Sequence, residues 1–89
     1  MDWSDFKLRK EYKYSYNICD QQNDELFYKQ CAALEKHIPG LTKERLLIDV
    51  DGSLYQIYYH QKGELSVNND YYIGALYIDS DFDIEPYFE

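Results

Sequence analysis

The sequence has few groups that could cross-link it or hold a metal, and it has no long apolar run. Its 89 residues include two cysteines, Cys19 and Cys31, too few for the disulfide framework of a small secreted protein or for a zinc ligand set. We therefore expect two reduced thiols, with a single Cys19–Cys31 bridge as the alternative. The longest apolar run, residues 71–78, is shorter than the roughly 18–20 residues of a membrane helix, so no membrane-spanning segment is expected.

A secretory signal is also missing from the start of the sequence. The first residues, MDWSD, lack the basic region and the apolar stretch that such signals share, which leads us to expect a cytoplasmic protein. A chain of 89 residues supports a single domain, and we find no repeat or linker that would divide residues 1–89.

Positive charge is scarce in the last third of the chain. Residues 63–89 contain seven acidic residues and no lysine or arginine, and the whole chain has a formal charge of -8. Because nucleic-acid backbones are bound by cationic surfaces that displace counterions, direct binding to nucleic acid is not expected. An acidic surface suits a basic protein partner, since complementary charge speeds the encounter. The alternative is that the charge serves solubility alone.

Catalytic and metal-binding patterns are lacking as well. His37 and His60 have no partners at metal-ligand spacing, and no local signature of a Ser–His–acid or Cys–His site is present. Residues 79–85 carry acids at the intervals of a calcium loop, but without the glycine that its turn requires. We expect no metal, no cofactor and no catalytic residue.

Periodic patterns predict a strand and then a helix in the first half of the chain. Residues 11–18 alternate in a way typical of a half-buried strand. One face of this strand is formed by Tyr12, Tyr14, Tyr16 and Ile18. Residues 24–37 follow Asn23, a natural N-cap, and repeat apolar side chains at helical spacing until Pro39-Gly40 ends the helix.

Residues 46–60, LLIDVDGSLYQIYYH, permit two interpretations. The segment around Asp49-Val50-Asp51-Gly52 resembles the first motif of the haloacid-dehalogenase phosphatases, which implies Asp49 as nucleophile and Asp51 as general acid/base. That chemistry needs a helix after the motif and downstream cations, whereas a second β-rich run follows Gly52 and Lys62 is the last basic residue. We therefore predict a hairpin.

The hairpin is expected to close through a two-residue type I′ turn at Asp51-Gly52. Val50 then pairs with Ser53, and Ile48 pairs with Tyr55. This register places one set of apolar residues on the core face, namely Leu46, Ile48, Val50, Tyr55, Ile57 and Tyr59. The opposite face receives a mixed set, which includes Tyr58.

The order of these elements predicts an α+β fold. We expect one helix, at about residues 24–37, packed on an antiparallel, meander-like sheet of four or five strands in the order β-α-β-β-(β)-β. The optional strand is residues 65–67, and the last strand is expected to begin near Tyr71.

The most distinctive pattern lies at residues 71–89. If this segment stays extended, one side is nearly continuously apolar and packs on the core. The other side carries carboxylates about 7 Å apart, at Asp79, Asp81, Asp83 and Glu85. Such a row repels itself, so we interpret it as a partner-binding surface. The alternative is that the acids protect an edge strand from aggregation or are simply solvated.

The eleven tyrosines are more than a small core can hide with every hydroxyl hydrogen-bonded. We expect four of them outside, next to the acids, at Tyr58, Tyr71, Tyr77 and Tyr87. Tyrosine is enriched in protein interfaces. Together with carboxylates it suits a groove rich in lysine and arginine, through ion pairing and cation–π contact.

In size, acidity, abundance of tyrosine and aspartate, and compact α+β layout, the chain resembles the small immunity proteins of bacterial contact-dependent inhibition and colicin-type systems. The resemblance implies a non-enzymatic inhibitor that neutralises a cognate toxin domain, often a basic nuclease. One alternative is a DNA-mimic inhibitor of the anti-restriction or anti-CRISPR type. Others are a phosphatase-like enzyme and a subunit that dimerises through its tyrosines; we expect a monomer, with a homodimer possible.

Overall fold

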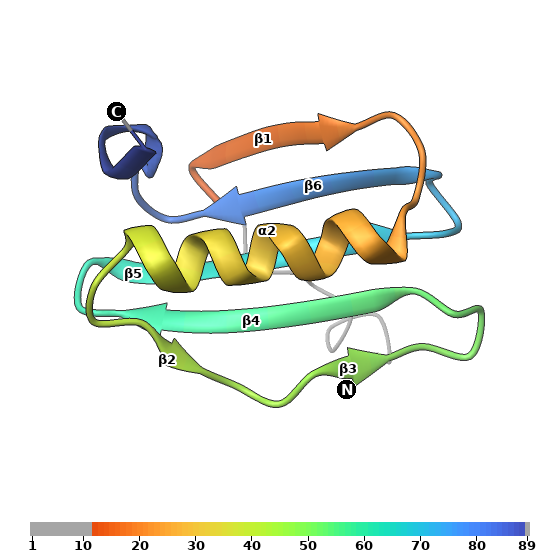
Figure 1. Ribbon diagram of the computed structural model, residues 1–89, viewed down its shortest axis with the longest axis horizontal. Coiled ribbons are helices and arrows are strands. Elements are labelled where there is room, and N and C mark those ends of the chain that lie inside the picture. Colours follow the sequence, from red (N-terminus) through yellow and green to blue (C-terminus); the bar gives the residue numbers. More distant parts are fainter. Residues whose placement is uncertain (1–11, 89) are drawn as a thin grey trace, which may run out of the picture.

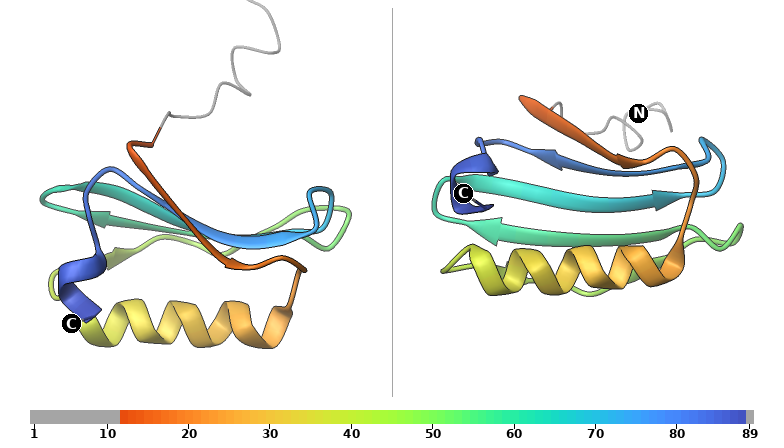
Figure 2. Two further views of the ribbon diagram at one scale, coloured as in Figure 1. Left: turned by 90° about the horizontal axis from the view of Figure 1, so that it is seen from above. Right: turned by 45° about the horizontal axis from the view of Figure 1, so that its top comes forward.

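The computed structural model describes residues 12–88, which form two layers, one α-helix and one antiparallel sheet (Figure 1). The elements are β1 (Tyr14–Cys19), α2 (Asp24–His37), β2 (Thr42–Lys43), β3 (Leu47–Ile48), β4 (Leu54–His60), β5 (Gly63–Asp70), β6 (Ala75–Ser80) and a 3₁₀ helix (Glu85–Phe88). The predicted α+β class is confirmed. Helix α2 lies along one face of the sheet (Figure 2).

The sheet has the order β1-β6-β5-β4-β2, and β3 also pairs with β4. Among the described residues it therefore has six strands, where the sequence predicted four or five. The difference arises between residues 42 and 48, which form two short strands beside β4. Strands β4, β5 and β6 follow one another as an antiparallel meander.

Helix α2 begins and ends where local signals predicted. The Asn23 side chain accepts a hydrogen bond from the backbone N–H of Leu26, as an N-cap does. At the other end the backbone N–H of Ile38 donates to the carbonyl of Leu34. Gly40 follows in a left-handed conformation, with a φ of 82°, and so turns the chain into β2.

The core lies between α2 and the sheet. Its buried apolar residues are Phe27, Cys31, Leu34, Ile38, Leu54, Tyr58, Leu65, Val67, Leu76, Ile78, Phe82 and Ile84. Cys19 and Cys31 are both free thiols. The described part of the chain contains no helix long and apolar enough to cross a membrane.

The predicted hairpin register is wrong by one residue. Leu47 pairs with Tyr55 and Ile48 with Leu54, so the strands are joined by residues 49–53 and not by a two-residue turn. The side chain of Asp51 accepts from the N–H of Ser53, and the N–H of Asp49 donates to the carbonyl of Ser53. These bonds stabilise a wider loop, as aspartate side chains commonly do in turns.

A shift of one residue exchanges the two faces of a strand. The core face of β4 is Leu54, Gln56 and Tyr58. Ile48 pairs with Leu54 and shares this face, yet Ile48 and the loop residue Val50 are both exposed. Gln56 is accommodated because its amide donates to two backbone carbonyls, those of Glu44 and Ile57.

The sequence predicted one extended strand over residues 71–89, and this is wrong for residues 71–88; Glu89 lies outside the described residues. Residues 71–74 are a turn, β6 covers only Ala75–Ser80, and the chain then bends into the 3₁₀ helix. The bend begins at Ser80, whose buried hydroxyl both accepts from the N–H and donates to the carbonyl of Phe82. The apolar residues of this segment reach the core from several elements, and its acids point in different directions.

Candidate protein-binding surface

The predicted row of carboxylates is divided into two groups. In the first group, the Glu64 carboxylate accepts from the Tyr12 hydroxyl at 2.5 Å, and the Glu64 N–H donates to Asp81 at 2.8 Å. Burial raises the pKa of Tyr12, and the hydrogen bond to Glu64 and the charges of Asp79 and Asp81 raise it further. Asp79 and Asp81 therefore lie close to Tyr12.

The second group connects the end of the chain to β1. The Asp83 carboxylate accepts from the Tyr16 hydroxyl at 2.8 Å and from the Glu85 N–H at 3.0 Å, and the Tyr16 oxygen accepts from the N–H of Ile84. Burial raises the pKa of Tyr16, with a further contribution from the bond to Asp83. Asp83 thus holds the C-terminal segment in place, and a partner-binding role for these acids stays a prediction.

Tyr58 was expected outside, and this placement is wrong. Its side chain is fully buried, and its hydroxyl donates to the Glu35 carboxylate at 2.6 Å. Glu35 also pairs with Lys43 at 3.2 Å. The cause is the register described above, which turns the Tyr58 face of β4 toward α2. A residue in this position cannot contact a partner.

Tyr77 and Tyr87 are partly exposed. Tyr77 pairs with Asn17 and Asn68 in the sheet, and it lies on the face opposite α2 because its neighbours on β6 point into the core. Tyr87 lies on the 3₁₀ helix, beside a pocket of about 400 Å³. Their expected role as anchors stays a prediction.

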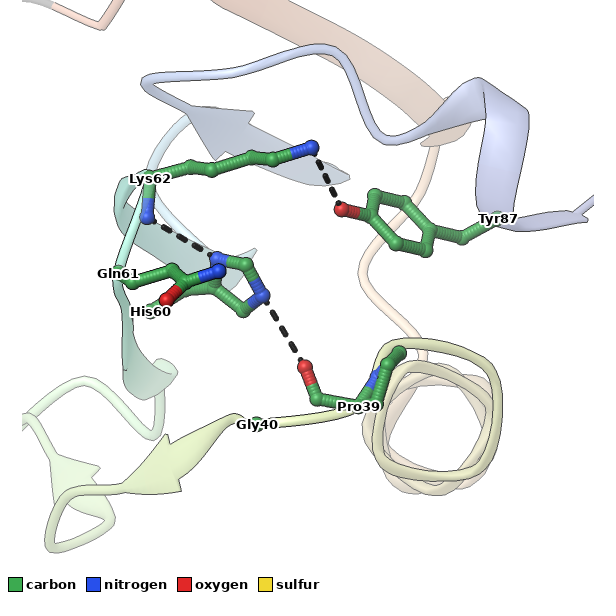
Figure 3. Close-up of a pocket in the computed structure, with 6 residues that line it drawn as sticks. All are labelled: Pro39, Gly40, His60, Gln61, Lys62 and Tyr87. Atoms are coloured by element: carbon green, nitrogen blue, oxygen red, sulfur yellow. Dashed lines mark hydrogen bonds between the residues drawn. The ribbon is translucent and has the colours of Figure 1, made fainter.

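The pocket beside Tyr87 lies at the end of the sheet where α2 ends (Figure 3). Its lining consists of Pro39, Gly40, His60, Gln61, Lys62 and Tyr87. The Lys62 ammonium donates to the Tyr87 hydroxyl at 3.1 Å, and the His60 ring contacts the Pro39 carbonyl through Nε2 at 3.0 Å and accepts from the Lys62 N–H through Nδ1. These contacts join Pro39, His60, Lys62 and Tyr87 to one another across the pocket.

Tyr71 lies at the opposite end of the sheet, where two loops are in contact. Its backbone N–H donates to the Ser53 hydroxyl at 2.9 Å, and its ring lies 3.6 Å from the position that a Cβ atom would take at Gly52. Its hydroxyl donates to the Asp24 carboxylate at 3.3 Å. Loop 49–53, turn 71–74 and the start of α2 therefore meet at this end.

Most large apolar side chains that are exposed among residues 12–88 lie on these two loops or on β3, which leads into loop 49–53. In order of exposure they are Val50 (102%), Tyr72 (92%), Ile48 (68%), Ile73 (60%), Leu47 (41%) and Tyr71 (40%). We call residues 47–51 and 71–73, together with Asp24, the loop-end surface. Exposed apolar side chains that gather at one end of a sheet in this way are typical of an interaction site.

Carboxylates surround these apolar side chains. The charge of Asp24 is the main cause that raises the pKa of Tyr71, and Asp51 contributes. Asp49 and Asp51 also raise the pKa of Tyr55, after burial. The ion pairs that the structure describes, Lys29–Glu25 and Lys43–Glu35, lie elsewhere. The loop-end surface is thus apolar with a negatively charged rim.

No family model, curated protein or solved structure matches this chain. The loop-end surface therefore has to be interpreted from its own chemistry. Within residues 12–88 no group of three or more His, Cys, Asp or Glu side chains is placed to hold a metal ion.

Sequence reasoning placed Tyr71 correctly at the surface but missed its neighbours. Ile48 and Val50 were assigned to the core face of the predicted hairpin, and Tyr72 to the core side of an assumed extended chain. One signal could have found Tyr72 and Ile73. They stand between Asn69-Asp70 and Gly74, residues that favour a turn, and side chains at the tip of a hairpin have no sheet to pack on.

Proposed function

We propose that this protein is a non-enzymatic inhibitor that binds a basic protein partner in the bacterial cytoplasm, with a cognate toxin domain such as a nuclease as that partner. The observation that supports this most is the loop-end surface, where exposed apolar side chains stand beside carboxylates that are in none of the ion pairs that the structure describes. The immunity-type resemblance of the composition points the same way.

The two components of the surface have different roles in binding. Aromatic and aliphatic side chains supply affinity when they are buried in an interface, and Tyr72 is the more exposed of the two tyrosines on this surface. The charges of Asp24, Asp49 and Asp51 steer a basic partner toward the surface and select against acidic ones. A nuclease groove is lined with cations that bind phosphates, so carboxylates that occupy it compete with the substrate.

The predicted C-terminal acids and the loop-end surface lie at opposite ends of the sheet (Figure 1), so they can be tested separately. Asp49→Asn with Asp51→Asn removes two charges from the loop-end surface. The carboxylate oxygens of both residues accept backbone N–H groups within the loop, and asparagine preserves that acceptor. Asp79→Asn with Glu85→Gln is the matched control, because it removes two charges from the other end.

Immobilised wild-type protein first captures the partner from an extract of the cells that encode it. The affinity of both double variants for this partner is then measured at several salt concentrations. We expect the loop-end variant to bind about tenfold more weakly and with a smaller salt dependence, and the control to stay close to wild type. The proposal for this surface is wrong if the control loses as much affinity, and the inhibitory function is wrong if the captured partner keeps its activity in the complex.

A further inference from the structure

The turn of residues 71–74 is held by hydrogen bonds at every backbone N–H group. The Asp70 carboxylate accepts from the N–H groups of Tyr72 (2.9 Å) and Ile73 (3.0 Å), and the Asp70 carbonyl accepts from Gly74 (2.8 Å). The N–H of Tyr71 donates to the Ser53 hydroxyl. Asp70 itself is only 8% exposed, so the residue that organises the turn is built into the body of the protein.

The two side chains at the tip of this ordered turn project into solvent. Tyr72 is 92% exposed and Ile73 is 60% exposed, so neither contributes to the core. Ordering a segment has an entropic cost, which here is met by bonds to Asp70 and Ser53. The result is a fixed backbone that presents a large aromatic and a β-branched side chain, both of which have few rotamers to lose on binding.

The surroundings of the turn restrict what it can bind. Asp24, Asp49 and Asp51 are exposed carboxylates, and none of them is in an ion pair that the structure describes. An anionic lipid surface would be repelled by them. A second copy of the chain is disfavoured, because each copy carries a net charge of -8. A protein whose surface carries lysine and arginine complements both the carboxylates and the apolar tip of the turn.

We propose that the 71–74 turn is a preformed plug, which inserts Tyr72 and Ile73 into an apolar pocket of the partner whose rim carries lysine or arginine. This deepens the proposed function and rests on it. Because the turn is already ordered before binding, little further ordering is needed, and preorganisation of this kind increases affinity. Tyr72 is the expected hot spot, since large aromatic side chains at the centre of an interface dominate binding energy.

Site-specific photo-crosslinking in the cells that encode the protein tests the plug directly. Tyr72→p-benzoylphenylalanine and Ile73→p-benzoylphenylalanine place the crosslinker at the tip. The matched control is the same substitution at Tyr59, which is 42% exposed and lies toward the far end of β4 from the loops. We expect one protein adduct from positions 72 and 73, absent at position 59, with lysine or arginine beside the crosslinked segment of the partner.

Three results overturn the plug. These are no protein adduct at positions 72 and 73, an adduct with a second copy of this chain, and an equally abundant adduct at position 59. Loss of partner binding in the Asp49→Asn, Asp51→Asn variant without adducts at the tip would refute the plug and leave the proposed function standing. A partner that is crosslinked at the tip but keeps its activity would refute the inhibitory function and leave the plug standing.

The affinities of three variants for the partner that crosslinking identifies separate the effect of the ordered turn on binding from the effect of its charge. Tyr72→Ser should weaken binding about 30-fold, while the urea midpoint of unfolding stays at the wild-type value because the side chain is exposed. Asp70→Ala removes the two side-chain bonds of the turn and should weaken binding about tenfold. Asp70→Asn loses the charge but keeps an acceptor, and should stay within about threefold. Equal losses for Asp70→Ala and Asp70→Asn would show that the charge of Asp70 matters and not the ordered turn.

Discussion

The hydroxyl of Tyr58 donates a hydrogen bond of 2.6 Å to the carboxylate of Glu35 and so connects strand β4 to helix α2. Tyr58 is fully buried, whereas the Glu35 side chain is 41% exposed. The pair thus bridges core and solvent. Glu35 in turn contacts Lys43 on β2, which makes it the point where three elements meet.

The first prediction concerns acid stability. The bond from Tyr58 is the main cause that lowers the pKa of Glu35 below its ordinary value of 4.5. A pKa that is lowered by folding adds stability above the unfolded-state pKa, and this stability is lost as the pH falls through the folded-state pKa. We expect Glu35→Gln to lower the free energy of unfolding by about 1 kcal/mol at pH 7, and by less at pH 3.

Urea unfolding at the two pH values measures this difference. Glu25→Gln is the control, because Glu25 pairs with Lys29 at 3.9 Å with both side chains largely exposed. Exposed pairs of this kind contribute less than about 0.5 kcal/mol. A Glu35→Gln deficit that is as large at pH 3 as at pH 7 would contradict the prediction.

The second prediction concerns alkaline stability. Burial is the main cause that raises the pKa of Tyr58 above its ordinary value of 10.0, and the bond to Glu35 raises it further. A raised pKa in an acidic group adds stability below the unfolded-state pKa, which is lost as the pH rises toward the folded-state pKa. Wild-type stability should therefore fall above about pH 10, and Tyr58→Phe should make this fall shallower. Thermal unfolding between pH 8 and pH 11 tests it, and an unchanged slope in the variant would contradict it.

The third prediction compares two glycines with positive φ. At Gly63 the φ is 141°, and an added Cβ atom would lie 2.5 Å from the Cβ of Asp81, while at Gly74 the φ is 75° with no atom within 4 Å. Gly63→Ala should lower the free energy of unfolding by about 3 kcal/mol, through strain and a clash. Gly74→Ala has the strain alone and should cost about 1 kcal/mol. If both variants lose the same free energy of unfolding in urea, the clash with Asp81 is relieved without cost and the prediction is contradicted.

The fourth prediction concerns Asn69, which connects β5 to the start of α2. Its side chain is fully buried. The side-chain carbonyl oxygen accepts from the backbone N–H of Asn23 at 2.8 Å, and the side-chain NH₂ group donates to the Asp24 carboxylate at 2.7 Å. Asn69→Leu removes both hydrogen bonds and should lower the free energy of unfolding, measured in urea, by about 2–3 kcal/mol. Asn17→Leu, at an exposed position with a bond to Asp20, is the control and should cost less than about 0.5 kcal/mol. Similar values for both variants would contradict the structural role of Asn69.

The elements that follow local rules were predictable. Helix α2 matches residues 24–37 because its N-cap, Asn23, and its stop, Pro39-Gly40, act within a few residues. The strand predicted at residues 11–18 from their alternation is present as β1, with the bounds Tyr14–Cys19. The candidate site was predicted less well, since Tyr71 was correctly placed outside while Tyr58 was not. The Tyr58 side chain is buried because the pairing of β3 with β4 is shifted by one residue from the predicted register. That shift depends on the hydrogen bonds that Asp49 and Asp51 accept within their own loop.

By itself, the sequence determined the fold class, the ends of α2 and the negative charge of the surface, because capping, periodicity and composition are local or additive properties. Tertiary structure alone decided which face of β4 is buried, because register depends on how a loop closes and on what the helix covers. It also decided that Asp81 and Asp83 are held by Glu64 and Tyr16, and that loop 49–53 and turn 71–74 lie side by side in space. Residues as far apart in the sequence as Gly52 and Tyr71 meet there because the β4, β5 meander brings the two loops to one end of the sheet.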